Sequence, residues 1–195
     1  MPDATILLSA SPREGNGTFL ARRLVSRALF PIQHICLSSY GVRPCIACGL
    51  CATQPGHCRF DGFPDDDGQK LLSLLYRAPA IIIMAPVYFY GPPAQLKALI
   101  DRSQVVWEAR RRASAPPRRR PFAAVLTAAR QQGERLFEAS ELILRCFASA
   151  LGFSWMEPLC LRGLDAPADA AASPETLATF DSWTDKLAAQ IGKAP

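Results

Sequence analysis

The sequence predicts an α/β domain in which helices cover both faces of a parallel sheet. Apolar runs of strand length alternate with amphipathic stretches of helix length along the 195 residues, the order that produces parallel strands joined by helices. The strand-like runs hold too few polar residues for a solvated face, as expected when both faces are covered. Hydrophobic residues make up 49% of the chain and charged residues 20%, which is ordinary for a globular protein.

Each element follows from these patterns in turn. The predicted strands cover residues 4–11, 33–39, 80–87, 121–129 and 154–161. The predicted helices, which have helical spacing of apolar residues or clear end signals, cover residues 18–30, 69–78, 92–103, 134–152 and 173–192. No internal repeat or long linker divides the chain. We therefore expect one domain over residues 1–195, with a cysteine-rich insertion at about residues 41–68 whose acidic residues 65–67 cap the next helix.

The length of the apolar runs and the first residues of the chain indicate the cellular compartment. No apolar run approaches the roughly 20 residues that a membrane-spanning helix needs. The first residues contain an acid, Asp3, where a signal peptide carries basic residues. We therefore expect a cytoplasmic protein with no membrane partner.

The net charge of +5 comes from one segment, residues 110–120. Without the six arginines of this segment, 16 basic residues remain against 17 acidic ones. We interpret the segment as a solvated, proline-containing loop, or alternatively as a docking patch for an acidic partner. No recognisable nucleic-acid motif accompanies the arginines, so we expect no nucleic-acid partner.

Ligands of such sheets bind beyond the carboxyl ends of the strands, and the first of these loops is rich in polar groups. Residues 9–18, SASPREGNGT, offer hydroxyls, an amide and a cation just before a helix. A helix N-terminus of this kind suits a single phosphate ester. The loop lacks both the dinucleotide-binding glycine pattern and the P-loop lysine. An ordinary polar turn capped by Thr18 is the alternative.

The loop after the third predicted strand is aromatic. Tyr88, Phe89 and Tyr90 stand between Pro86 and Gly91. Aromatic rings and backbone amides at a strand end suit a flat heteroaromatic ligand. Alternatively the rings pack on a helix or on a second subunit, and the spacing does not separate these possibilities.

Four of the seven cysteines lie in CIACGLCATQPGHC, residues 45–58, with the spacing C-x2-C-x2-C-x6-C. Such a run suits a 4Fe–4S cluster and fits structural zinc poorly, because structural zinc sites pair two separated hooks. Zinc and unliganded cysteines remain alternatives. The run follows the second strand, so we expect it near the ligand loops. Cys36, Cys146 and Cys160 lie in apolar patterns and are expected to be buried.

Three motifs occur in order over nearly the whole chain: Ser-Pro-Arg followed by Asn and Thr, the cysteine run, and Pro-Val-Tyr…Gly-Pro-Pro-Ala-Gln-Leu-Lys…Ile-Asp-Arg. In this combination the chain resembles the NADPH-dependent FMN reductase group of flavodoxin-like proteins, and in particular its iron–sulfur flavoprotein branch. The resemblance implies a flavodoxin-like sheet of order 2-1-3-4-5, FMN as a cofactor, and a homodimer or homotetramer.

The resemblance also assigns residues to the cofactors. The implied FMN contacts are Ser9, Ser11, Arg13, Asn16, Thr18, Pro86, Val87, Tyr88, Phe89, Gly91, Thr127 and Ala128. The implied ligands of the 4Fe–4S cluster are Cys45, Cys48, Cys51 and Cys58.

We therefore expect a flavin-dependent oxidoreductase that transfers electrons between FMN and the cluster, with no catalytic acid or base. Its electron donor is NAD(P)H or an acidic electron-transfer protein such as a ferredoxin. A cluster-free NAD(P)H-dependent FMN or quinone reductase is one alternative. A non-enzymatic electron carrier like flavodoxin is the other.

Overall fold

The structure, a computed structural model, describes residues 4–117 and 119–192. Its strands are β1 (Thr5–Ser9), β2 (Ile32–Cys36), β3 (Ile81–Pro86), β4 (Pro121–Thr127), β5 (Ser154–Trp155) and β6 (Leu159–Leu161). They form a parallel sheet of order β2-β1-β3-β4-β5, which confirms the predicted order. The fifth predicted strand is divided in two: β5 pairs with the start of β4, and β6 pairs with its end.

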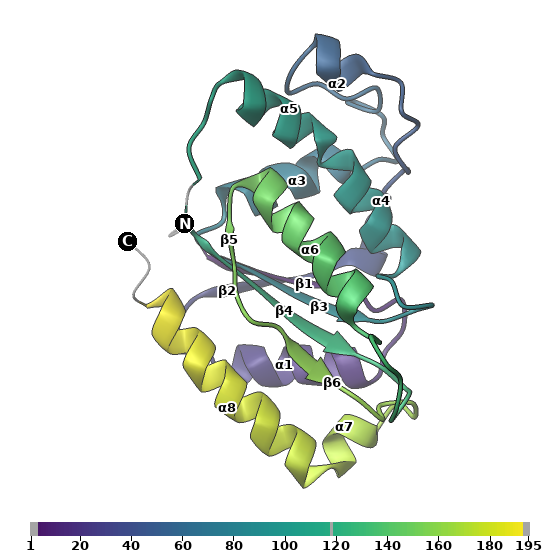
Figure 1. The fold of residues 1–195 in the computed structure, drawn as a ribbon, viewed down its shortest axis with the longest axis vertical. Helices are drawn as coiled ribbons and strands as arrows, with labels where there is room; N and C mark the ends of the chain where they lie inside the picture. The colour runs from purple at the N-terminus through teal and green to yellow at the C-terminus, as the bar shows by residue number, and fades with distance from the viewer. Residues whose placement is uncertain (1–3, 118, 193–195) are drawn as a thin grey trace.

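Helices cover both faces of the sheet (Figure 1). One face carries α1 (Asn16–Arg27), α7 (Asp169–Ala172) and α8 (Pro174–Ile191). The other carries α3 (Gly68–Arg77), α4 (Ala94–Arg102), α5 (Gln104–Arg112) and α6 (Glu138–Leu151). A 3-10 turn, η1 (Leu37–Ser39), follows β2, and the short helix α2 (Leu50–Thr53) lies in the cysteine-containing segment. In the described part of the chain, no helix has the length and apolar character to cross a membrane.

The central strands are buried on both faces, which explains their continuous apolar runs. Successive side chains of a strand point to opposite faces. In β1, Ile6 and Leu8 therefore join the core under α3 to α6, and Leu7 joins the core under α1 and α8. Phe122 of β4 lies in the first of these cores, with ring contacts to Phe147 and other aromatic residues of the following units.

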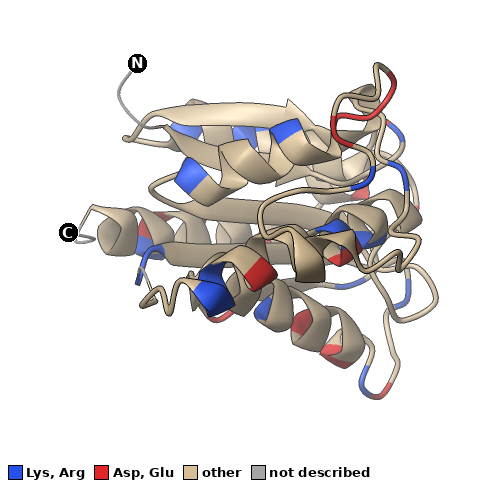
Figure 2. Ribbon diagram, turned by 90° about the horizontal axis from the view of Figure 1, so that it is seen from above, with Lys and Arg blue, Asp and Glu red and all other residues tan. Residues whose placement is uncertain are grey.

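The arginine-rich segment differs from the prediction. Residues 110–112 were expected in a loop, but they form the last turn of α5. The pattern was hard to recognise because only Val105 and Glu108 of this helix are buried. Arg110 donates to two carbonyls at the end of α6, at 3.0 and 3.1 Å, and Arg112 donates to the carbonyl of Ala52. Figure 2 shows basic residues on several helices and loops, with acidic residues among them.

A buried ion pair between Asp66 and Arg102 closes the base of the cysteine-containing segment, residues 41–68. The two Nη atoms of Arg102 donate to the two carboxylate oxygens at 2.8 and 3.0 Å, and both side chains are 1% exposed. Asp66 also accepts the backbone N–H groups of Arg43 at 2.9 Å and Gly68 at 3.1 Å. One carboxylate thus joins α4 to both ends of the segment.

The neighbouring residues Gly41 and Asp67 reinforce this closure. The N–H of Asp67 donates to the carbonyl of Gly41 at 2.7 Å, and the N–H of Gly41 donates to the Asp67 carboxylate at 3.1 Å. A Cβ on Gly41 would lie 2.4 Å from the carbonyl oxygen of Asp65, so a side chain does not fit there. Asp67 precedes α3, but its side chain makes no capping bond to that helix. The predicted capping role is therefore wrong for Asp67, whose carboxylate closes the segment instead.

The pKa of Asp66 reflects this environment. Burial acts to raise it, but the hydrogen bonds from Arg102 and Arg43, together with the charge of Arg102, outweigh burial and lower the pKa. A carboxyl whose pKa is lowered by folding contributes stability above its unfolded pKa of about 4. That contribution is lost as the pH falls through the lower value of the folded state.

Asp66→Asn is expected to lower the free energy of unfolding by about 3 kcal/mol near neutral pH, because the buried guanidinium loses its counter-charge. At a pH below the pKa that Asp66 has in the folded protein, the free energies of unfolding of the two proteins should differ far less, since Asp66 is then protonated in the wild type. Urea unfolding followed by circular dichroism measures this free energy at neutral pH and at the acidic pH. Asp101→Asn is the matched control, because Asp101 forms an exposed pair with Lys97 and should change stability by less than about 1 kcal/mol. Equal effects of the two variants at neutral pH would contradict the role of the buried pair.

Candidate functional site

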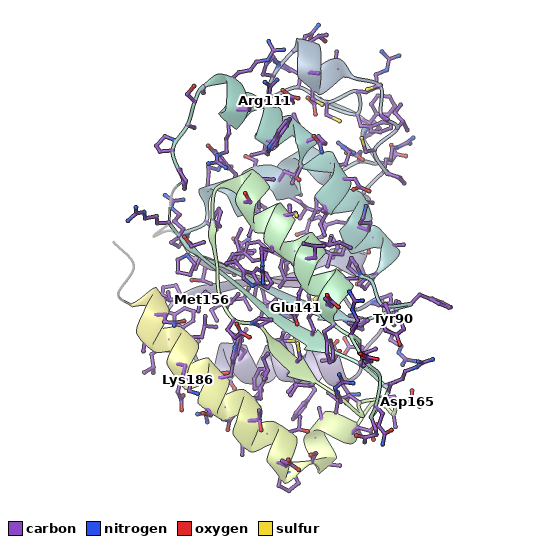
Figure 3. All side chains as sticks on the ribbon, viewed as in Figure 1. Tyr90, Arg111, Glu141, Met156, Asp165 and Lys186 are labelled. Atoms are coloured by element: carbon purple, nitrogen blue, oxygen red, sulfur yellow. The ribbon has the colours of Figure 1, made fainter. Side chains whose placement is uncertain are left out.

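The carboxyl ends of the strands meet at one edge of the sheet, where two cavities adjoin. The smaller, about 170 Å³, lies among the loops after β1, β3, β4 and β6. It is lined by Ser11, Arg13, Glu14, Gly15, Asn16, Gly17, Pro86, Val87, Tyr88, Thr127, Ala129, Leu164, Asp165 and Pro167. The larger, about 310 Å³, is lined by Val87, Tyr88, Phe89, Tyr90, Ala128, Ala129, Arg130 and Leu136. Figure 3 shows Tyr90 and Asp165 on this side of the molecule, toward which β3 and β4 point.

The smaller cavity is polar and lies at the start of α1. Gly15 precedes this helix, whose first N–H groups lack intrahelical partners and carry the positive end of the helix dipole. Arg13 adds a cation, and the Ser11 hydroxyl donates to the Arg13 carbonyl at 2.7 Å, which shapes the loop. Glu14 also lines the cavity, and Arg22 balances its charge at 3.2 Å. These groups suit a phosphate.

Asn16 ties this loop to the segment after β6. Its side-chain Nδ2 donates to the carbonyl of Ala166 at 2.8 Å, and its Oδ1 accepts the N–H of Ala170 at 2.9 Å. The residue is buried. Both ends of the amide are therefore engaged within the protein, and the side chain holds the two walls of the cavity together.

The larger cavity is bordered by a strained aromatic turn. The backbone groups of Tyr88 and Gly91 exchange hydrogen bonds at 2.9 and 3.0 Å. Phe89 and Tyr90 between them have φ values of 49° and 64°, as in the tight hairpin turns that favour asparagine and glycine. Each such residue costs about 1–2 kcal/mol, and such strain concentrates at functional sites. The Phe89 side chain is fully exposed, so the turn presents aromatic surface beside the cavity.

The structure brings most of the twelve predicted FMN contacts together. The smaller cavity contains Ser11, Arg13, Asn16, Pro86, Val87, Tyr88 and Thr127. Phe89 and Ala128 line the larger one, while Ser9, Thr18 and Gly91 line neither. The Ser9 hydroxyl instead lies 2.8 Å from Nε2 of His34 in β2, whose pKa is lowered by burial and by the charge of Arg22. The FMN contacts themselves remain predictions.

Sequence reasoning missed the wall formed after β6. Leu164, Asp165 and Pro167 line the smaller cavity. The loops after β4 and β6 are joined through Ala128, whose N–H donates to the Leu161 carbonyl at 2.9 Å and whose carbonyl accepts the N–H of Leu164 at 3.0 Å. The last predicted strand could have indicated this wall, because its carboxyl end lies beside that of β4. Leu136 of the larger cavity was also missed, and no sequence motif marks it.

The four clustered cysteines line a separate cavity of about 360 Å³, together with residues of α4 and α5 that include Arg102 and Glu108. All four thiols are free. The segment leaves the sheet after β2 but lies over α4 and α5, with α2 outermost (Figure 1). It shares no lining residue with the two strand-end cavities. Helix α4 connects the regions, since it begins shortly after the aromatic turn and ends in the cysteine cavity, about 14 Å along its axis.

The donor set of this cavity, four thiols, matches that of an iron–sulfur cluster in number and type. Within residues 4–117 and 119–192, no three metal-binding side chains lie close enough to hold a metal ion. A 4Fe–4S cube spreads its four thiolates around a larger body. Arg102, which also lines this cavity, has its Nε buried without a hydrogen-bond partner among the described residues. The four thiols and this donor fit an anionic cluster.

Two pKa shifts describe this cavity. Burial of Arg102 opposes its charge, but interactions with Asp66 and with Cys58 outweigh burial and raise its pKa. Burial is the main cause that raises the pKa of the Cys51 thiol, and nearby Cys45 and Glu108 add to it. Without a bound metal, Cys51 therefore favours its neutral form.

The prediction of burial was wrong for two of the other cysteines. Cys36 and Cys146 are exposed, and Cys160 is half-buried. Cys36 ends the edge strand β2, and Cys146 lies on the outer face of α6. Burial and the neighbouring Glu141 raise the pKa of Cys160 to about 12.

Several iron-sulfur flavoproteins resemble the chain in sequence. An iron-sulfur flavoprotein of Methanocaldococcus jannaschii is 38% identical over 101 residues, which is 50% of this chain and 50% of that protein. An iron-sulfur flavoprotein of Methanosarcina thermophila is 37% identical over 103 residues, 49% of this chain and 50% of its own length. The chain thus spans about half the length of these relatives. One from Archaeoglobus fulgidus is 29% identical over 150 residues, 75% of this chain and 69% of that protein.

Solved structures share the fold at low sequence identity. The NAD(P)H:quinone oxidoreductase from Methanothermobacter marburgensis superposes with a TM-score of 0.67 at 16% identity, over 94% of this chain and 95% of that chain. A flavodoxin, WrbA-like protein from Agrobacterium tumefaciens has a TM-score of 0.60 at 17% identity, over 99% of both chains. A family model described as NADPH-dependent FMN reductase matches residues 5–153. That match runs from β1 through both predicted flavin loops to the end of α6, and the chain therefore belongs to the NADPH-dependent FMN reductase family.

Proposed function

We propose that the protein is a flavin-dependent oxidoreductase that binds FMN at the carboxyl edge of its sheet. The observation that carries this proposal is the pair of adjoining cavities, one polar and one bordered by aromatic rings, which share Val87, Tyr88 and Ala129. FMN has a phosphate at one end and a flat ring system at the other. The family match supports the same cofactor.

The chain's own residues would bind and orient this group. Arg13 and the first N–H groups of α1 bind the phosphate, while Asn16 holds the cavity walls in place. The aromatic turn and the loop at Thr127 border the ring and exclude water from it. Bound FMN accepts a hydride or two electrons and releases electrons singly, so the protein needs no acid or base for electron transfer.

A 4Fe–4S cluster in the cysteine cavity is the second part of the proposal, with Cys45, Cys48, Cys51 and Cys58 as its ligands. The number and type of donors, the unused Arg102 Nε and the names of the relatives support it. The cluster would exchange single electrons with the flavin. Such thiols need a reducing compartment, which agrees with a cytoplasmic location.

The electron donor is proposed to be NAD(P)H or an acidic electron-transfer protein. The family description supports NAD(P)H. The last turn of α5 supports an acidic protein, because Arg112 contacts the cysteine segment and Arg111 stacks over the exposed Trp107 ring at 5.3 Å. A homodimer or homotetramer is proposed from the exposed aromatic turn, whose rings a second copy of the chain would cover.

A cluster-free NAD(P)H-dependent FMN or quinone reductase is the second candidate. One observation favours it: the cysteines of the described residues do not converge on a metal position. A flavodoxin-like electron carrier would use the same FMN cavities. Oxidation of NAD(P)H by the purified protein distinguishes either enzyme from the carrier.

The decisive experiment is anaerobic purification, followed by an absorption spectrum, iron and sulfide analysis and EPR. A yellow protein that contains iron and sulfide supports the full proposal, and an iron-free yellow protein supports the cluster-free reductase. Saturating FMN should raise the unfolding temperature of the apoprotein. An unfolding temperature that FMN does not raise would contradict the flavin site in the main proposal and in both alternatives.

Arg13→Ala is expected to weaken FMN binding roughly 10- to 100-fold, because hydrogen bonds to charged groups contribute about 1.5–3 kcal/mol. Riboflavin, which lacks the phosphate, should bind both proteins equally. Quenching of flavin fluorescence in titrations of apoprotein measures both ligands. Arg27→Ala, at the far end of α1, is the matched control. An equal loss of affinity for FMN and riboflavin would place Arg13 away from the phosphate.

Cys58→Ser is expected to remove most of the iron and acid-labile sulfide, because a 4Fe–4S cluster needs four thiolates. FMN content should stay at the wild-type level, since the cysteine cavity shares no residue with the flavin cavities. Cys146→Ser changes an exposed thiol on α6 and should leave iron content unchanged. Unchanged iron in Cys58→Ser, or an equal loss in both variants, would rule out the proposed ligand set.

A further inference from the structure

The guanidinium of Arg102 is held in one orientation at the edge of the cysteine cavity. Asp66 accepts from both Nη atoms, and the carbonyl of Arg43 accepts from Nη1 at 3.2 Å. The ring of Phe60 lies 5.0 Å from the guanidinium carbon. On another side the backbone leaves little room, since a Cβ on Gly68 would lie 3.0 Å from that carbon. These contacts hold the guanidinium on several sides.

One donor of the guanidinium, the Nε–H, has no hydrogen-bond partner among the described residues. A guanidinium has five N–H donors in one plane. Asp66 takes one from each Nη atom, and Arg43 takes the outer donor of Nη1, so the Nε–H and the outer N–H of Nη2 form the remaining edge. Nε is buried and has no partner among the described residues. Arg102 lines the cavity of the four cysteines, and Cys58 is the cysteine that interacts with its guanidinium.

We propose that Arg102 is a positioning residue of the cysteine cavity, whose Nε–H donates to the Cys58 sulfur once a cluster is bound and thereby raises the cluster's reduction potential. This inference rests on the proposed 4Fe–4S cluster. Hydrogen bonds to the sulfurs of an iron–sulfur cluster are one of the factors that set its potential. A donor stabilises the more negative, reduced state, so its presence raises the midpoint.

The expected effect on the cluster midpoint comes from the position of the N–H donor and not from the net charge of the cavity. Asp66 balances the charge of Arg102, and both side chains are almost fully buried. A lysine at this position keeps one positive charge and one partner for Asp66, but it has no planar fork and no Nε–H at the free edge. Arg102→Lys therefore removes the donor while it keeps the charge.

The experiment compares wild type, Arg102→Lys and Lys97→Met. Lys97→Met is the matched control, because it removes a cation of the same helix that pairs with Asp101 outside the cavity. Iron, sulfide and FMN contents are measured first, and then the cluster midpoint by an EPR-monitored redox titration. In Arg102→Lys we expect a filled cluster whose reduction equilibrium is about tenfold less favourable, a midpoint about 59 mV lower for one electron. The FMN midpoint in the same sample, and both midpoints of Lys97→Met, should equal those of the wild type.

A second variant covers the case in which Arg102→Lys loses its fold around the cysteines. Arg102→Met combined with Asp66→Asn removes both charges together, so no unpaired charge is buried. The same lower cluster midpoint is expected.

Wild-type cluster midpoints in both variants would overturn the inference and leave the proposed function standing. Loss of the cluster from both variants with FMN retained would overturn it as well, because Arg102 would then hold the segment rather than set the potential. Wild-type protein without iron and sulfide would overturn the proposed cluster and this inference together.

Discussion

The buried ion pair of Asp66 and Arg102 is the interaction on which the arrangement of the two candidate sites depends. It joins the end of α4 to both ends of the cysteine-containing segment. The other end of α4 follows the aromatic turn at the strand-end cavities. One short helix is therefore attached to a site at each end. A buried pair of this kind costs desolvation of both charges, and here the backbone N–H groups around Asp66 supply the additional hydrogen bonds that offset it.

Much of the fold could be predicted because its signals are local. The continuous apolar runs of β1, β3 and β4 follow from burial on both faces, and the rule that ligands bind at strand ends identified the loops after Ser9 and Thr127. Helix α5 was missed because its outer face is charged and tertiary contacts supply its stability. Cys36 and Cys146 show the same limit, since an apolar neighbourhood in sequence does not say which face of an edge strand or helix points outward.

The ion pair and the wall after β6 were beyond sequence reasoning for a different reason. Asp66 is one of three adjacent acids and Arg102 lies 36 residues away, so nothing in the local pattern pairs them. Leu164 and Asp165 line the smaller strand-end cavity because the last strand is divided and its second half pairs with the end of β4. The cysteine spacing predicts a ligand set, but metal binding is coupled to folding, so the positions that these thiols would take around a metal do not follow from the spacing.

The cysteine-containing segment contributes little to either apolar core. From this segment only Val42 and Cys51 pack against the larger core, and both are partly exposed. The two apolar cores between the sheet and its helices therefore depend little on this segment. Under the proposed function, iron would reach the exposed thiols of Cys45 and Cys48 from the solvent side. For the proposed cluster, the supply of iron would therefore decide which form of the protein a cell contains, since the two apolar cores receive little from this segment.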